Sequence, residues 1–311
     1  MIGINKIFII IKNKNGLINI QCKRLSERLM NRCFIKDNNF KEASIQQVLE
    51  YQIQLLGREM DENCNLFFDF VTKNNLITKD FFEKYAKYAE KAISINYTNN
   101  IQLLYLICIN LALFHKQFAS GENDGLIQSG NKLKSFKFII NKLLKNIRTD
   151  YNINRKHYFM YHYRLEIKIQ LFKSLYFLTL LNNEYSLEID IGGDLKSFLE
   201  QYRVFLLYNR EFTIIESNLQ QKVEVILIEL NKAYEKEKKL DLASVDFYCK
   251  PNKIIEVNGP KHYYQTLEKQ KGKYILKKAC FEFEKHEVLD IHYKEICQNI
   301  DKVKQTIKDF I

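Results

Sequence analysis

Residues 240–264 read LDLASVDFYCKPNKIIEVNGPKHYY, and this stretch decides the fold of the C-terminal part of the chain. Two short runs, 244–248 and 253–258, are rich in apolar residues and typical of β-strands. The residues between them, 249–252, contain a proline and an asparagine and suit the turn of a β-hairpin. The sequence therefore predicts two antiparallel strands here.

The alternation of side chains places polar groups on one face of this hairpin. Asp246 in the first run, and Glu256 and Asn258 in the second, can gather on one side. Gly259 and Pro260 then turn the chain, so that His262 comes back near them. Two carboxylates beside a histidine suit a divalent metal ion. A hydrogen-bonded polar cluster without metal is the alternative interpretation.

The pattern after the hairpin predicts a small α/β domain over 239–311. Residues 274–285 are typical of a helix, 287–293 (EVLDIHY) alternate like a strand, and 295–311 have the periodicity of an amphipathic helix. The expected order is two strands, a helix, a strand and a helix, which predicts a small mixed sheet flanked by helices.

Residues 36–238 are expected to be almost entirely α-helical and to form the main part of the fold. The central segment, 101–118, is apolar on every side and predicts a buried helix rather than a membrane span. A solenoid-like array of helical hairpins is compatible with this region. Besides one starting near residue 39, helices are predicted at 64–75, 79–95, 132–147, 157–181, 194–208 and 219–238, with loops at 120–130 and 182–193, the second carrying a short strand.

The composition indicates a folded, basic protein of a reducing compartment. Apolar residues make up 46% of the 311 residues, and the formal net charge is +11. Such a charge suits a polyanion such as nucleic acid, although an AT-rich coding bias also inflates lysine. The seven cysteines form no Cys-x-x-Cys pair, so neither a zinc site nor a disulfide framework is indicated.

The first 35 residues predict an organelle-targeting segment. The first acidic residue is Glu27, and a basic start free of acids resembles a mitochondrial transit segment. An ordinary N-terminal strand, built on the isoleucine-rich run 7–11, is the alternative. That run is too short to span a membrane. The basic residues before Glu27 are Lys6, Lys12, Lys14, Lys23 and Arg24.

The C-terminal motifs carry a family resemblance. The order VDF, IIEVNGPKHY, a helix containing LKK, and VLDIHYKEI resembles the RAP domain, which occurs in organellar proteins including the FAST-kinase-domain group. Asn258 stands where that family has a second acid, and His292 where it has a proline. The matching positions are Asp246, Glu256, Gly259, Pro260, His262, Gly272, Leu276, Lys277 and the run 291–293.

The resemblance implies a fold similar to that of the PD-(D/E)xK endonucleases. Those enzymes use an acidic pair, and usually a lysine, to hold a metal ion and activate water. Catalysis would here fall to Asp246, Glu256 and His262, with Mg²⁺ held by the two carboxylates. Because Asn258 is neither an acid nor a lysine, we expect a binding protein without a cofactor, and Mg²⁺ only if the protein is a nuclease.

The resemblance also implies an RNA-binding protein of the mitochondrial matrix, or of another organelle, acting in RNA processing, stability or ribosome biogenesis. Its partners would be mitochondrial rRNA or mRNA and mitochondrial ribosomal proteins, with no membrane. In 154–168 (NRKHYFMYHYRLEIK) cations alternate with aromatic rings, a pattern that suits single-stranded RNA, although the same rings suit a core. Two alternatives stay open, a metal-dependent endoribonuclease and a structural rRNA-binding subunit of a divergent mitochondrial ribosome. The expected RNA-binding residues are Arg155, Lys156, Arg164, Lys261, His262 and Lys277.

Overall fold

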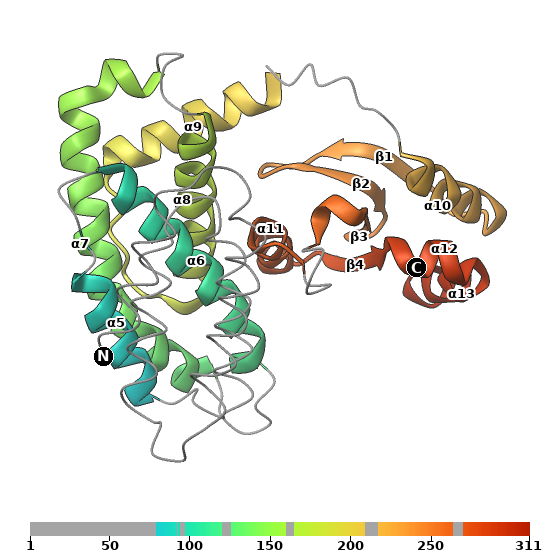
Figure 1. Cartoon of the computed structure of the whole chain (residues 1–311), viewed down its shortest axis with the longest axis horizontal. Helices are drawn as coiled ribbons and strands as arrows, with labels where there is room; N and C mark the ends of the chain where they lie inside the picture. The colour runs from blue at the N-terminus through green and yellow to red at the C-terminus, as the bar shows by residue number, and fades with distance from the viewer. Residues whose placement is uncertain are drawn as a thin grey trace, which may run out of the picture. The chain divides into compact units, whose positions relative to one another are not determined.

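The structure, a computed structural model, describes residues 79–91, 93, 97–119, 126–159, 165–208, 217–263 and 270–311 (Figure 1). The expected targeting segment, 1–35, and the helices expected between 39 and 75 lie outside these residues. The described residues belong to one compact unit, 52–311. Within them, no helix combines the length and the apolarity that crossing a bilayer requires.

The first half of this unit is a bundle of helices around α6. Its central helix contacts both α7 and α8, and residues such as Leu104, Ile107 and Phe114 are fully buried. The expectation of a buried central helix over 101–118 is therefore confirmed. The helices are α5 (Lys79–Lys91), α6 (Tyr97–Ala119), α7 (Leu126–Phe159), α8 (Leu165–Tyr185) and α9 (Gly193–Tyr208).

Helix α7 corrects two expectations about the helical region. It begins at Leu126, so the loop predicted over 120–130 is wrong from that residue on, and Gly130 lies inside the helix. It also continues past Ile147 to Phe159, because Ile147 and Tyr151 are buried and the Tyr151 ring packs on Phe198 of α9 at 5.9 Å. Asparagine has a low helix propensity, but packing against α9 keeps this last part of α7 helical. Residues 186–192 form no strand.

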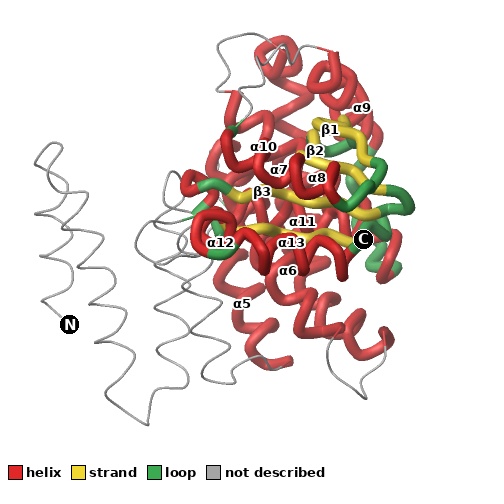
Figure 2. Tube along the Cα trace, turned by 90° about the vertical axis from the view of Figure 1, so that its right-hand side faces the viewer, coloured by secondary structure: helices red, strands yellow, loops and turns green. Residues whose placement is uncertain are grey.

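The C-terminal part is a four-stranded mixed sheet with helices on both faces (Figure 2). The strand order is β1-β2-β3-β4, with β1, β2 and β3 antiparallel and β4 parallel to β3. This confirms the predicted mixed sheet with Asp246 and Glu256 on neighbouring strands. The elements are α10 (Asn218–Glu229), β1 (Tyr234–Lys239), β2 (Ser244–Cys249), β3 (Lys253–Asn258), the 3-10 turn η1 (Pro260–His262), α11 (Gly272–Phe283), β4 (Glu287–His292), α12 (Tyr293–Gln298) and α13 (Ile300–Phe310).

Strand β1 was not expected, and the helix predicted over 219–238 is wrong after Glu229. Helix α10 ends there because Asn231 adopts a left-handed backbone with φ 51, a common helix stop. The following YEKEKK is rich in helix formers, yet it pairs with β2 and its Tyr234 ring packs on Phe247 at 5.6 Å. The boundary expected between residues 238 and 239 falls inside this strand.

The helix expected over 295–311 is two helices, α12 and α13. They meet at Asn299, whose side-chain oxygen accepts a hydrogen bond from the backbone N–H of Lys302 at 3.0 Å. Asparagine favours this capping position because its side chain replaces a missing helical hydrogen bond.

The two faces of the sheet differ in chemistry. One face is apolar and packs against α10, α12 and α13, and its core includes Phe247, Ile255 and Ile291. The other face carries the acidic side chains and is covered by α11, whose Lys277 reaches Glu256 of β3. Helix α11 also contacts α6 and α8, so it lies between the sheet and the helical bundle (Figure 1).

We predict that Phe247→Ala lowers the free energy of unfolding by about 3–5 kcal/mol, because it empties a fully buried position in the core of the sheet. Val225→Ala on α10, where the side chain is 52% exposed, should change it by less than about 0.5 kcal/mol. Urea unfolding of the two variants measures the difference. Equal losses would contradict the assignment of the apolar face.

Candidate functional site

Asp246 lies at the point where β2 and β3 separate. The backbone pairing of the two strands extends to Phe247 and Ile255, and beyond it the Asp246 side chain accepts a hydrogen bond from the Val257 N–H at 2.6 Å. Its second oxygen accepts one from Gln220 of α10 at 2.7 Å. Burial raises the pKa of Asp246, whereas the Val257 N–H lowers it. Both oxygens of this carboxylate therefore have protein partners.

Glu256 forms a buried ion pair with Lys277. The Lys277 amine, which comes from α11, donates to the two Glu256 oxygens at 2.8 and 2.9 Å and to the Ser244 carbonyl at 2.8 Å. Glu256 is only 7% exposed. Burial raises its pKa to about 7, against the opposing effect of Lys277. The pair joins β2, β3 and α11 through one ammonium group.

A second polar chain runs from β4 to η1 through Asn258. In the parallel register of β3 and β4, Glu256 lies beside Asp290. The Asn258 amide nitrogen donates to Asp290 at 2.8 Å, and its oxygen lies 2.7 Å from the Nδ1 of His262. Lys278 of α11 forms an ion pair with Asp290.

The space at this cluster is too small for a metal ion and a substrate. The cavity between Glu256, Lys277, Asp290 and their neighbours has a volume of about 10 Å³, at the lower limit for a single water molecule. Among the described residues, no group of three or more His, Cys, Asp and Glu side chains is arranged to hold a metal. In this arrangement Asp246 and Glu256 do not fit Mg²⁺, because the Lys277 ammonium group contacts both Glu256 oxygens where a cation would have to bind.

Aromatic rings gather where β3 and β4 end. Parallel strands place their carboxyl ends at the same edge of the sheet, so η1 and the start of α12 are neighbours. The rings of His262 and Tyr274 stack at 4.1 Å, those of Tyr263 and His292 lie 4.1 Å apart, and those of His292 and Tyr293 stack at 4.6 Å. We call these five residues the aromatic edge; all are partly exposed.

Lysines surround the aromatic edge. Lys261 and Lys273 are exposed, and the Lys273 amine lies 4.9 Å from the centre of the Tyr274 ring. Burial lowers the pKa of His262 to about 4, and the charges of Lys277, Lys273 and Lys271 lower it in the same direction. His262 is therefore neutral at physiological pH.

His292 has a structural role at the start of α12. Its Nδ1 accepts a hydrogen bond from the Lys294 N–H at 3.0 Å, which caps the N-terminus of α12. A proline has no side chain able to accept this bond.

The structure brings together only part of the site expected from the sequence. Asp246, Glu256 and Lys277 meet, and His262 joins the cluster through Asn258. Lys261 lies at the exposed edge, while the Lys277 amine is bound to Glu256. Arg155 and Lys156 lie in α7 with their side chains outside the described part, and Arg164 lies outside the described residues. The sequence did not indicate Gln220, Glu237, Lys278 or Asp290.

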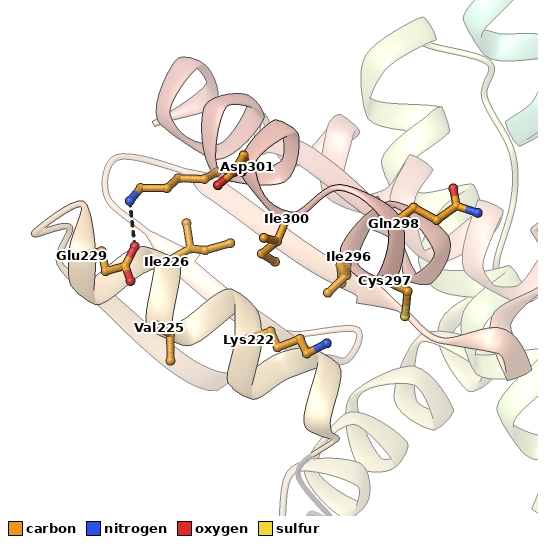
Figure 3. A pocket seen from close by; sticks show the side chains of 10 residues that line it. Lys222, Val225, Ile226, Glu229, Ile296, Cys297, Gln298, Ile300 and Asp301 are labelled. Atoms are coloured by element: carbon orange, nitrogen blue, oxygen red, sulfur yellow. Dashed lines mark hydrogen bonds and ion pairs between the residues drawn. The ribbon is translucent and has the colours of Figure 1, made fainter.

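A separate hollow lies between α10 and the α12–α13 pair (Figure 3). It has a volume of about 490 Å³, and aliphatic residues such as Val225, Ile226 and Ile300 make up much of its lining. The Lys304 amine binds Glu229 at 2.7 Å across its rim. Among its described lining residues there is no aromatic ring on which a base could stack, so the aromatic edge is the better candidate for a nucleic-acid interface.

No protein-family model matches this chain, and a search of curated proteins finds no match. The function is therefore argued from the geometry of the polar cluster and the aromatic edge.

We predict that Lys277→Met destabilises the fold more at pH 8 than at pH 5. A folded-state pKa that is raised from 4.5 to about 7 gives stability that is present below pH 4.5 and is lost as the pH rises through 7. Without Lys277, this pKa rises further, so the buried charge costs about 3 kcal/mol at pH 8 and much less at pH 5. Guanidinium unfolding at both pH values measures the effect.

The matched control is Lys277→Met combined with Glu256→Gln, which removes both charges of the pair. Because this variant has no Glu256 carboxyl, its unfolding free energy should depend less on pH between 5 and 8 than that of the wild type. A single variant that loses the same stability at both pH values would contradict the buried ion pair.

Proposed function

We propose that this chain is an organellar RNA-binding protein acting in RNA processing, RNA stability or ribosome biogenesis. The aromatic edge is the observation that carries the proposal. It combines partly exposed rings from η1, α11 and α12 with surrounding lysines. Single-stranded nucleic acid is bound by this combination, since bases stack on aromatic side chains while cations contact the phosphates.

The family resemblance supports the same function. The motif residues lie on β2, β3, η1, α11 and β4 in the order in which the RAP pattern has them. A fold similar to that of the PD-(D/E)xK endonucleases is part of this proposal, and the small mixed sheet flanked by helices is compatible with it. A mitochondrial location and a solenoid-like helical region are further parts of this proposal, and a structural rRNA-binding subunit of a divergent mitochondrial ribosome is an alternative to it.

The internal bonding of the polar cluster favours binding over cleavage. Asp246 and Glu256 accept hydrogen bonds from Gln220, Val257 and Lys277, and the cavity beside Glu256 and Asp290 is only about 10 Å³. A metal-dependent hydrolase needs an open position for metal-bound water and substrate. The cluster instead holds α11 on the sheet, below the edge at which we place RNA.

We predict that the full chain binds single-stranded RNA with an affinity that falls steeply as salt rises, because each phosphate contact releases counterions. Lys261→Gln and Lys273→Gln should each weaken binding and reduce the slope of log K against log salt by about one. The control is Lys308→Gln on α13, an exposed lysine away from the aromatic edge. Helix α13 reaches the start of β3, where Lys253 contacts Phe310, whereas the aromatic edge lies at the end of β3. Fluorescence anisotropy at several salt concentrations measures all three.

Equal losses in the three lysine variants would assign binding to net charge alone. No loss in Lys261→Gln and Lys273→Gln, with binding intact, would place the RNA elsewhere on the protein.

A second candidate is a Mg²⁺-dependent endoribonuclease, and the position of Lys277 favours it. The sequence has no lysine two residues after Glu256, yet α11 brings the Lys277 amine to that carboxylate at 2.8 Å. An acidic pair and a lysine, the set that the PD-(D/E)xK endonucleases use, therefore lie together. They would have to separate before a metal could bind, because the lysine occupies both Glu256 oxygens.

We predict no cleavage of labelled RNA by the wild-type chain with Mg²⁺ or Mn²⁺ beyond that seen with EDTA. The comparison variants are Asp246→Ala and Glu256→Ala, each tested for RNA binding in parallel. Metal-dependent cleavage that disappears in both variants while binding survives would make the protein an enzyme.

A further inference from the structure

The hydrogen bonds that end at His262 have a defined direction. The chain starts at Lys278, whose ammonium group can only donate, and Asp290 accepts from it. Asp290 also accepts from the amide nitrogen of Asn258 at 2.8 Å. The Asn258 oxygen therefore faces His262. Asn258 is 1% exposed, so burial and these two bonds fix the orientation of its amide.

This direction determines the tautomer of His262. The Asn258 oxygen can only accept, so the Nδ1 of His262, 2.7 Å away, carries the hydrogen. In the neutral imidazole the lone pair then lies on Nε2. Stacking on Tyr274 at 4.1 Å and 17° holds the ring plane. Among the described residues, the ring forms no other hydrogen bond than the one at Nδ1.

The acceptor at Nε2 differs from the lysines around it, whose charges lower the pKa of His262. Lys261, Lys271 and Lys273 can only donate, and phosphate and the ring oxygen of a sugar can only accept. Their mutual recognition does not distinguish RNA from DNA. The ribose 2′-hydroxyl is a hydrogen-bond donor that RNA has on every nucleotide and DNA lacks.

We propose that the Nε2 of His262 accepts a hydrogen bond from a ribose 2′-hydroxyl and thereby makes the aromatic edge selective for RNA over DNA. The inference rests on the proposed function, because it takes the aromatic edge as the RNA site. It also gives a role to Asn258: an aspartate there would accept from His262 but would place a second carboxylate beside Asp290.

The test compares the affinities of the full chain for a single-stranded RNA, for DNA of the same sequence, and for RNAs with one 2′-deoxy nucleotide each. The variants are His262→Phe, which keeps a ring to stack on Tyr274, and His262→Gln, which keeps a side-chain acceptor. We expect the wild type to prefer RNA by about five- to tenfold, as one hydrogen bond gives. The His262→Phe variant should lose the preference for RNA without weaker DNA binding, and the His262→Gln variant should keep part of that preference.

Each other outcome overturns the inference. The inference fails if the wild type binds RNA and DNA equally, or if the preference for RNA persists in His262→Phe. Neither result affects the proposed function. A loss in His262→Phe that is the same for RNA and DNA shows that His262 contacts a group that the two nucleic acids share. A preference for RNA that is insensitive to every single 2′-deoxy position assigns the preference to another group. Binding to neither nucleic acid overturns the proposed function as well.

The tautomer has an independent measurement. Nitrogen-15 NMR of the free protein should show a protonated Nδ1 and an unprotonated Nε2 for His262 near neutral pH. A protonated Nε2 would contradict the assigned direction of the Lys278–Asp290–Asn258 chain.

Discussion

The buried ion pair between Lys277 and Glu256 is the interaction on which the C-terminal part of the structure depends. A single ammonium group joins the Ser244 carbonyl of β2, the Glu256 carboxylate of β3 and helix α11. The same helix places Phe283 against Phe177 of α8 at 5.8 Å, so the pair also helps to hold the sheet against the helical bundle. Breaking such a pair leaves an uncompensated buried charge, which is far more costly than losing a surface contact.

This arrangement separates structural from functional polar groups. Asp246, Glu256 and Asn258, which resemble a catalytic set in the sequence, are bound to their own protein partners below α11. The groups left at the carboxyl ends of β3 and β4 are rings and lysines, which suit recognition of nucleic acid. The hydrogen bonds from Asp290 through Asn258 to His262 connect the buried cluster to the aromatic edge, because they determine the tautomer of His262.

Local sequence patterns predicted much of this fold. The alternation in 244–258 placed Asp246 and Glu256 on one face of neighbouring strands, and the apolar content of 101–118 predicted the buried α6. Strand β1 escaped prediction because its glutamates and lysines favour a helix, whereas pairing with β2 is a tertiary effect. The ion pairs of Lys277 and Lys278 depend on how α11 crosses the sheet, and Asp290 depends on the parallel register of β3 and β4. None of these is visible in local periodicity.

The central claim is that RNA lies on the aromatic edge. Ultraviolet crosslinking of the full chain to a single-stranded RNA, followed by mass spectrometry of the crosslinked peptides, tests it most directly. We expect crosslinks at Tyr263, Tyr274 or Tyr293, whose rings are partly exposed after η1, in α11 and in α12. Crosslinks confined to the helical region before residue 208, with none at these tyrosines, would contradict it.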